Sequence, residues 1–421
     1  MAETMKTLFA GLVRTGPHGT LCWSKPIFIK KGWIPGTRRH NATHFVRAGS
    51  MEATQIPNVS KVGSGITRIL GQNPGPYTLQ GTNTYLIAGE QSSVLIDTGE
   101  GKDSYLGLLE PVLRSNPPVS DIILTHRHRD HVGGLPSVLN LLSSLGGPCT
   151  SPPVRRMPKV WKFRSDGASY DRDIQEVLVQ HFEASSSNSS DIRSKPGCDA
   201  SETPELNFLS EHQEFRLSSV AKLQITHTPG HTEDSISCLL LEDPHVQVDG
   251  EEARGDTLDS RKEEVLSAIF VGDTILGGSS SAFEDLLVYL QSLQKLLDIS
   301  NRATRTDLPV RLYPAHGHII LDGPAVIRQF IDHRLARERQ ILDCFRQHGR
   351  LISSSADPAA RCLTPEKLIE LMYPAELPKA VYPAALRGIH QHLKKLQEEG
   401  LVDRCGPNPA ELWCLVERAD T

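Results

Sequence analysis

A short segment of this 421-residue chain concentrates side chains that bind metal ions: His126, His128, Asp130 and His131 lie within six residues. The residues just before them, 121–125 with the sequence DIILT, form an apolar run that predicts a β-strand. Imidazole nitrogen and carboxylate oxygen suit zinc and similar divalent ions. In an extended backbone, His126 and His128 point to the same side. The segment therefore predicts a metal site at the end of a strand.

Other polar residues are placed in the same way, just after a predicted strand. They are His231 (strand 222–226), Asp273 (strand 268–271) and His316 (strand 310–313). Alone, each would be an ordinary loop residue. Together with the first four residues they supply seven possible ligands at strand ends, which can meet at one edge of a fold.

The periodicity of apolar residues predicts strands that alternate with helices. The other predicted strands are 66–70, 82–87, 92–96 and 235–241, and the predicted helices are 104–114, 135–145, 283–297 and 324–348. Polar residues that follow strand ends are typical of layered α/β enzymes, so this class of fold is expected.

The chain divides into three predicted parts. Residues 1–62 form a basic, acid-poor leader, which is either a mitochondrial transit peptide or a disordered extension. Residues 63–350 form the α/β domain, with polar insertions near 183–205 and 243–265. Residues 362–421 begin with a helix-start signature at Thr364-Pro365, continue with a helical pattern at 380–399 and end in a possible hairpin at 401–416. This order resembles a winged-helix domain.

Composition excludes some classes of protein. The net charge is −5, so the whole molecule does not attract nucleic acid through charge alone. No apolar run approaches the roughly 18 residues that a membrane span needs. The eight cysteines are scattered without a C-x-x-C pair, which argues against a zinc finger and predicts free thiols. The expected location is the mitochondrial matrix or the cytoplasm, without a membrane partner.

The order H-x-H-x-D-H, followed by single H, D and H residues, resembles the metallo-β-lactamase superfamily, over about residues 63–340. The resemblance implies a four-layer αββα sandwich with two zinc ions at one edge. It implies that the first zinc is held by His126, His128 and His231, the second by Asp130, His131 and His316, and that Asp273 bridges them. It also implies that Asp97 orients a ligating histidine, although Asp97 could simply form the turn before Gly99.

The implied reaction is hydrolysis. A metal ion lowers the pKa of its bound water from 15.7 toward about 7, which makes a hydroxide nucleophile at neutral pH. Asp130 could also orient that nucleophile or carry its proton, and it is therefore the candidate catalytic residue.

Two groups within the superfamily match further. Residues 73–86, 272–276, 283–286 and 333–334 resemble the beta-lactamase-like protein 2 group, mitochondrial enzymes implied to cut single-stranded RNA. The same signatures occur in fungal lactamase-like thioesterases, which release an aromatic polyketide from an acyl carrier protein. Asp273 stands where β-lactamases of the best-known class carry Cys, which disfavours antibiotic cleavage. RNA is the first expectation and the thioester the alternative. A non-enzymatic, metal-stabilised scaffold is the third.

Two positions depart from the resembled pattern. Arg127 stands where the family usually has Trp, which could change the lining of the pocket. Ala315 replaces Gly before His316, which leaves His318 as a second candidate for that ligand, although the position in the motif favours His316.

Features outside the ligand set bear on the substrate. Six arginines make the helix after 324 locally basic, as RNA binding would require, or they simply face solvent: Arg328, Arg334, Arg337, Arg339, Arg346 and Arg350. Four apolar residues could line a slot for an acyl group, or they belong to the core: Tyr77, Leu79, Phe283 and Leu286.

Overall fold

The computed structural model describes residues 55–145, 157–165, 168–187, 205–243, 264–302, 309–352, 361–373, 377, 382–405 and 411–416. It also describes two short paired strands, β1 (Val13–Thr15) and β2 (Leu21–Trp23). The rest of the predicted leader before residue 55, and most of both predicted insertions, lie outside the described residues.

The first sheet has seven strands in chain order. They are β3 (Val59–Gly63), β4 (Ile66–Leu70), β5 (Asn83–Ala88), β6 (Ser93–Ile96), β7 (Val119–Leu124), β8 (Lys159–Phe163) and β9 (Leu206–Leu209). Pairing is antiparallel from β3 to β6 and parallel from β6 to β9. The sheet thus starts at Val59 rather than near Gly63. Strands β8 and β9 were not predicted, because both are short and β8 carries two lysines.

The second sheet has five strands, also in chain order. They are β10 (Glu214–Arg216), β11 (Ala221–His227), β12 (Ile236–Glu242), β13 (Val265–Gly272) and β14 (Arg311–Pro314). Only the β13–β14 pair is parallel.

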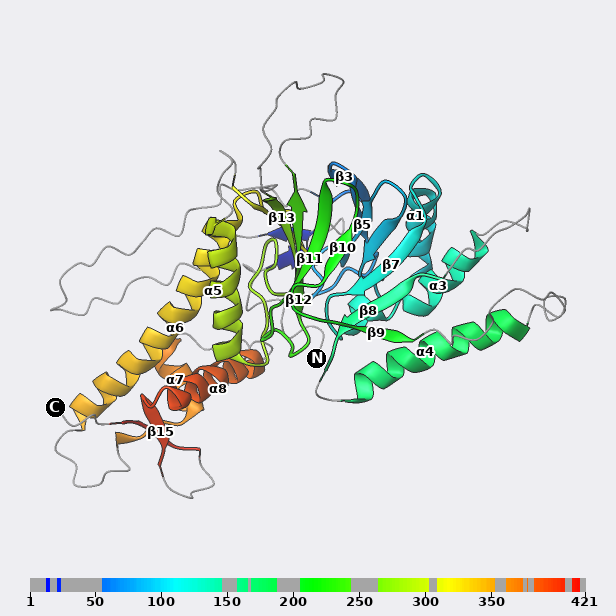
Figure 1. Cartoon of the computed structure of the whole chain (residues 1–421). Helices are drawn as coiled ribbons and strands as arrows, with labels where there is room; N and C mark the ends of the chain where they lie inside the picture. Colours follow the sequence, from blue (N-terminus) through cyan, green and yellow to red (C-terminus); the bar gives the residue numbers. More distant parts are fainter. Residues whose placement is uncertain are drawn as a thin grey trace, which may run out of the picture.

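The two sheets pack face to face, with helices on both outer faces (Figure 1). Helices α1 (Asp103–Arg114), α3 (Leu135–Ser144) and α4 (Ala168–Ser187) cover the seven-stranded sheet. Helices α5 (Leu286–Arg302) and α6 (Gly323–Leu351) cover the five-stranded sheet. The apolar side chains between the sheets include Tyr85, Phe270 and Tyr313, whose rings contact each other. The predicted αββα sandwich is confirmed.

Strand ends on both sheets supply the turns that carry the predicted ligands. One turn holds the short helix α2 (Arg129–Val132), directly after β7. Another contains Gly230, whose φ is 121°; a Cβ there would lie 2.4 Å from the backbone nitrogen of Tyr289. Only glycine fits that approach, which brings the turn before His231 against α5.

The C-terminal part forms a separate small module. It contains α7 (Pro365–Met372), α8 (Tyr382–Glu398), β15 (Val402–Arg404) and β16 (Trp413–Leu415). The Thr364 hydroxyl caps α7 by accepting from the Lys367 amide, and Pro365 occupies the first turn, as predicted. The module core continues onto the last turns of α6 (Figure 1). The predicted order of helix, helix and hairpin is confirmed.

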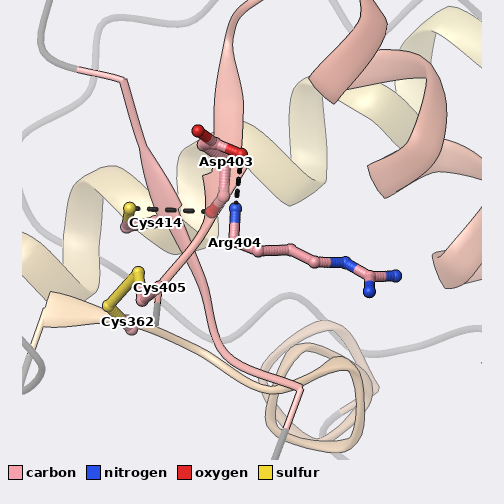
Figure 2. Close-up of a disulfide and its surroundings, with 5 residues drawn as sticks. All are labelled: Cys362, Asp403, Arg404, Cys405 and Cys414. Carbon is pink, nitrogen blue, oxygen red and sulfur yellow. Dashed lines mark hydrogen bonds between the residues drawn. A yellow bond between two sulfur atoms is a disulfide. The ribbon is translucent and has the colours of Figure 1, made fainter. Parts of the chain in front are cut away.

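The prediction that the cysteines are free thiols is wrong for one pair. Cys362 and Cys405 form a disulfide, which joins the segment before α7 to the β15–β16 hairpin (Figure 2). The two residues are 43 positions apart. Backbone hydrogen bonds between Leu363 and Trp413 bring the segment beside the hairpin. No local spacing in the sequence signals this pairing, because packing within the module creates it.

No helix among the described residues combines the length and apolarity needed to cross a membrane.

Candidate metal centre

All seven predicted ligands meet at one edge of the sandwich, in two adjacent groups. The first group contains His126, His128, His231 and Asp273, and the second contains Asp130, His131 and His316. Within each group the potential ligand atoms lie within 4.8 Å of one another. His318 belongs to neither group, so the geometry favours His316 for the position that the sequence left open.

Three imidazoles of the first group face a common point. His126 Nε2 lies 2.9 Å from His128 Nδ1 and 3.3 Å from His231 Nε2, and the last two ring nitrogens are 3.0 Å apart. Nitrogens bound at 2.0–2.1 Å around a tetrahedral zinc are about 3.3 Å apart. The three nitrogens are therefore already close to the spacing that one zinc ion requires.

The second group combines two imidazoles with a carboxylate. Asp130 Oδ2 lies 3.2 Å from both His131 Nε2 and His316 Nε2. Both rings are buried, whereas the Asp130 side chain keeps 23% of its exposure. Asp130 is therefore the member of this group that solvent or a substrate can reach.

Asp273 lies between the groups and turns one oxygen to each. Its Oδ2 lies 3.5 Å from His231 Nε2 and 4.0 Å from His126 Nε2. Its Oδ1 lies 3.2 Å from His316 Nε2 and 3.6 Å from His131 Nε2. This placement matches the bridging role that the resemblance implies.

Asp97 orients histidines of both groups. Its Oδ2 lies 2.8 Å from His131 Nδ1, and it also accepts from the Thr125 hydroxyl at 2.8 Å. That hydroxyl lies 3.1 Å from His126 Nδ1, so it can accept the proton of this ring. Because carboxylates accept, the arrangement places protons on both Nδ1 atoms and turns both Nε2 atoms toward the metal centre. Asp97 also has φ of 60°, so it forms the turn as well.

The side chains that steady the remaining ligands were not identified from the sequence. His231 Nδ1 lies 2.8 Å from the Ala282 carbonyl, which fixes that ring. The Thr82 hydroxyl donates to Asp130 Oδ2 at 2.9 Å. The Asn83 amide donates to the carbonyls of Pro314 and Gly317, on either side of His316. Thr82 and Asn83 lie in a motif used for the family resemblance, but only the fold reveals their contacts.

The electrostatics of the two groups are opposite. Burial, followed by the neighbouring imidazoles, lowers the pKa of His126 well below its usual value, and burial lowers that of His128 to about 4. In the second group burial also lowers the pKa of His316, but the carboxylates of Asp273 and Asp130 have the larger effect and raise this pKa to about 9. Although burial opposes it, the imidazoles of His131 and His316 hold the pKa of Asp130 well below its usual range.

These properties fit metal ions. The first group includes the neutral rings of His126 and His128, whose lone pairs can bind a cation, and the second includes the Asp130 carboxylate, which favours positive charge. The donor set is entirely nitrogen and oxygen, as zinc and similar divalent ions accept. The structure thus supports divalent metal binding by these residues.

Arg127, the departure inside the histidine segment, pairs with acidic side chains that lie outside both ligand groups. Both of its terminal nitrogens are used: one lies 2.7 Å from both carboxylate oxygens of Glu284, and the other lies 3.4 Å from Asp234. Its guanidinium also lies over the ring of Tyr170, 5.2 Å from the centroid. Asp234 is fully buried and also pairs with Lys162 at 2.7 Å. Arg127 therefore links the turns after β7, β11 and β13 beside the metal centre.

Comparisons with known proteins agree with this geometry. The family model described as metallo-beta-lactamase superfamily matches residues 77–247, and the model described as beta-lactamase associated winged helix domain matches residues 364–413. The fold is also similar to a beta-lactamase domain protein from Burkholderia ambifaria, with a TM-score of 0.52, 15% identity, and coverage of 85% of this chain and 93% of that one.

Curated relatives span most of the chain. The beta-lactamase-like protein 2 homolog of Drosophila melanogaster is 32% identical over 82% of this chain and 92% of its own length. The homolog of the same name from Caenorhabditis elegans is 29% identical over 83% and 90%. The atrochrysone carboxyl ACP thioesterase of Aspergillus novofumigatus is 26% identical over 85% and 86%. The chain therefore belongs to the metallo-beta-lactamase superfamily of hydrolases, with a beta-lactamase associated winged-helix domain at its C-terminal end.

Proposed function

We propose that this protein is a binuclear zinc hydrolase that cuts single-stranded RNA. The observation that carries the hydrolase assignment is the pair of ligand groups joined by Asp273, with one carboxylate oxygen facing each group. Two adjacent ions are the usual means of stabilising both the attacking and the leaving oxygen of a displacement.

Each ligand group would hold one ion. His126, His128 and His231 would hold the first, Asp130, His131 and His316 the second, and Asp273 would contact both. When bound, the ions would supply Lewis acidity and lower the pKa of a water molecule toward about 7.

The protein's own side chains perform the remaining tasks. Asp97 accepts the Nδ1 proton of His131 directly, and it holds the Thr125 hydroxyl that accepts the Nδ1 proton of His126. Both rings therefore keep their Nε2 atoms free of protons. Asp130 is partly exposed, and Thr82 fixes one of its oxygens. Asp130 can therefore orient the attacking water and accept its proton.

Two observations favour RNA over a thioester. First, the relative matched at 32% identity is named beta-lactamase-like protein 2 homolog, the group whose resemblance implies RNA cleavage. Second, two of the four residues predicted to line an acyl slot pack inward: Leu286 is 1% exposed within the core, and Phe283 stacks on Tyr289. Of the four predicted lining residues, Tyr77 is the one that is clearly exposed.

The basic helix α6 contributes less than the sequence suggested. Arg334 is 7% exposed and donates to the carbonyl of Ser281, whose hydroxyl contacts the Asp273 carbonyl and His231 Nδ1. Arg334 therefore supports the surroundings of these two ligands rather than contacting a nucleic acid. Arg339 and Arg350 remain exposed on the same helix. The RNA proposal thus uses the exposed arginines and not the buried one.

The second candidate is a thioesterase acting on an acyl carrier protein. It is favoured by the relative from Aspergillus novofumigatus, whose name describes this activity and which matches over 85% of this chain. The third candidate is a non-enzymatic scaffold in which the metals have a purely structural role. Such a scaffold would not need an exposed acidic side chain at the metal centre, whereas Asp130 is partly exposed.

A side-by-side assay tests the proposal. The full chain, supplied with zinc, is incubated with a single-stranded RNA oligomer and, separately, with an acyl-pantetheine thioester. We expect zinc-dependent cleavage of the RNA. His318→Ala is the matched control, because His318 lies in the same turn as His316 but outside both ligand groups. Turnover of the thioester alone would replace the first candidate with the second, and turnover of neither would refute both.

A further inference from the structure

A second group of ligating side chains lies in the C-terminal module, away from the His/Asp centre. Cys362 precedes α7, Cys405 follows β15, and Cys414 lies on β16 (Figure 2). Their three Sγ atoms lie within 4.8 Å of one another. Among the described residues, this is the one such group outside the His/Asp centre. The proposed hydrolysis makes no use of it.

A single disulfide accounts for only part of this arrangement. It joins Cys362 to Cys405 and leaves Cys414 as a free thiol, which donates to the Asp403 carbonyl at 3.6 Å (Figure 2). The Cα atoms of Cys362 and Cys405 are 6.9 Å apart. Disulfides usually span roughly 4.4–6.8 Å between Cα atoms, so this backbone separation lies just beyond their usual range.

The same arrangement suits a tetrahedral ion. Sulfurs bound at about 2.3 Å to a tetrahedral zinc are roughly 3.8 Å apart, which requires no direct bond between them. Three sulfurs within 4.8 Å need only small adjustments to reach that spacing. A site with three cysteines uses every sulfur of the cluster, whereas the disulfide uses two.

We propose that reduction converts Cys362, Cys405 and Cys414 into a thiolate site for one zinc-class divalent ion, which fastens the β15–β16 hairpin to the start of α7. The disulfide and the ion are alternative states of the same sulfurs. The three thiolates are soft donors. The preference of this site among metal ions therefore differs from that of the nitrogen and oxygen centre of the α/β domain.

The chemistry of the conversion balances with a dithiol reductant. The reductant supplies two electrons and two protons, the Cys362–Cys405 bond breaks into two thiols, and the reductant becomes a disulfide. Binding of the ion then releases the thiol protons to solvent. Three sulfurs leave the fourth position of a tetrahedral ion to water.

The surroundings of Cys414 suit a cation. Asp403 is the cross-strand partner of Cys414 in the β15–β16 hairpin, so its carboxylate would attract a divalent ion beside the three sulfurs. Arg404 does not compete, since its side chain points away and pairs with Glu411 (Figure 2).

The ion would serve the module by linking three of its segments. Among the described residues, the module core is smaller than the other three apolar clusters, with eleven buried residues that include Trp413 and Phe345. Small cores gain much of their stability from disulfides or structural metals. The three cysteines tie the segment before α7 to both strands of the hairpin, which is where such a link stabilises most.

Cobalt binding tests the proposal on the full chain. Cobalt(II) bound to thiolate sulfur gives an intense near-ultraviolet charge-transfer band, and the seven predicted ligands of the other centre contain no sulfur. We expect the band on the reduced protein once cobalt is in excess over the two sites of the His/Asp centre, and its loss in Cys414→Ser and Cys405→Ser. Cys344→Ser, a free and half-buried cysteine on α6, is the matched control and keeps the band. The oxidised protein shows no band.

Alkylation of the wild-type chain provides a test that does not depend on a variant folding. After reduction, zinc is added in excess over the two sites of the His/Asp centre, and the free thiols are alkylated. Peptide mass spectrometry should show Cys362, Cys405 and Cys414 protected together, while Cys344 reacts as it does without zinc. A reduced protein that lacks the cobalt band, or a band that persists in Cys414→Ser, overturns the proposal. So does alkylation of the three cysteines at the rate seen without zinc.

Discussion

The protein gathers ligating side chains in two places, and the two differ in how they are held. At the edge of the sandwich, histidines and aspartates follow the ends of strands in two large sheets, and hydrogen bonds from Asp97, Thr82 and Asn83 orient the residues around them. In the module, three cysteines meet beside one short hairpin. The first site is rigid because the fold supports it. The second contributes to the support of its own module.

The largest expected effect comes from a substitution that disrupts the first site. Asp273→Ala removes the carboxylate that faces both ligand groups, so we expect turnover to fall to the level of the blank. The fold should survive, because the apolar layers on both faces of the sheets are untouched. Turnover assays at saturating zinc, metal analysis and circular dichroism measure this. Turnover within a few-fold of the wild type would contradict the bridging role.

A smaller loss is expected from the residue that orients two histidines. Asp97→Asn keeps the positive φ, which Asn tolerates, but removes the charge beside His131. Partners of this kind typically contribute roughly 10–100-fold to metal affinity or activity. Zinc titration of turnover should therefore show a weaker apparent affinity for zinc. An unchanged zinc titration would mean that Asp97 serves only as a turn residue.

A single hydrogen bond to Asp130 should matter less. Thr82→Val removes the hydroxyl that donates to Asp130 and keeps the shape of the side chain. Hydrogen bonds to charged groups contribute about 1.5 kcal/mol or more, so we expect roughly a ten-fold lower kcat. Thr82→Ser is the matched control, because it keeps the hydroxyl and should recover most of the rate. Equal rates in both variants would exclude a role for this hydrogen bond.

The smallest effect on turnover is expected from the second site. Cys362→Ser removes the disulfide, and loss of such a link typically costs about 2–4 kcal/mol of stability. The cost should appear in urea unfolding followed by tryptophan fluorescence, to which Trp413, buried in the module, contributes. Turnover of the folded enzyme should stay within two-fold, and Cys344→Ser should change neither property. A large loss of turnover would show that the two sites are coupled.

Much of the fold could be predicted from local patterns. The strands that carry ligands are apolar runs of four to eight residues in the structure, and the long helices repeat apolar residues at helical spacing. Strands β8 and β9 escaped prediction because they are short. Lys162 on β8 looks like a surface residue, yet it is fully buried against Asp234 and Asp171. Its counter-charges come from distant segments, which a local pattern does not contain.

The sequence alone determined which residue types form the metal centre, because each ligand follows a strand whose apolar pattern is local. Only the tertiary structure decided how they are used: which oxygen of Asp273 faces which group, and that Asp97 serves both groups. The same holds for the cysteines, which are scattered along the chain and meet only when the hairpin packs beside α7. Strand ends are set by neighbours in sequence, whereas these contacts are set by packing between segments far apart.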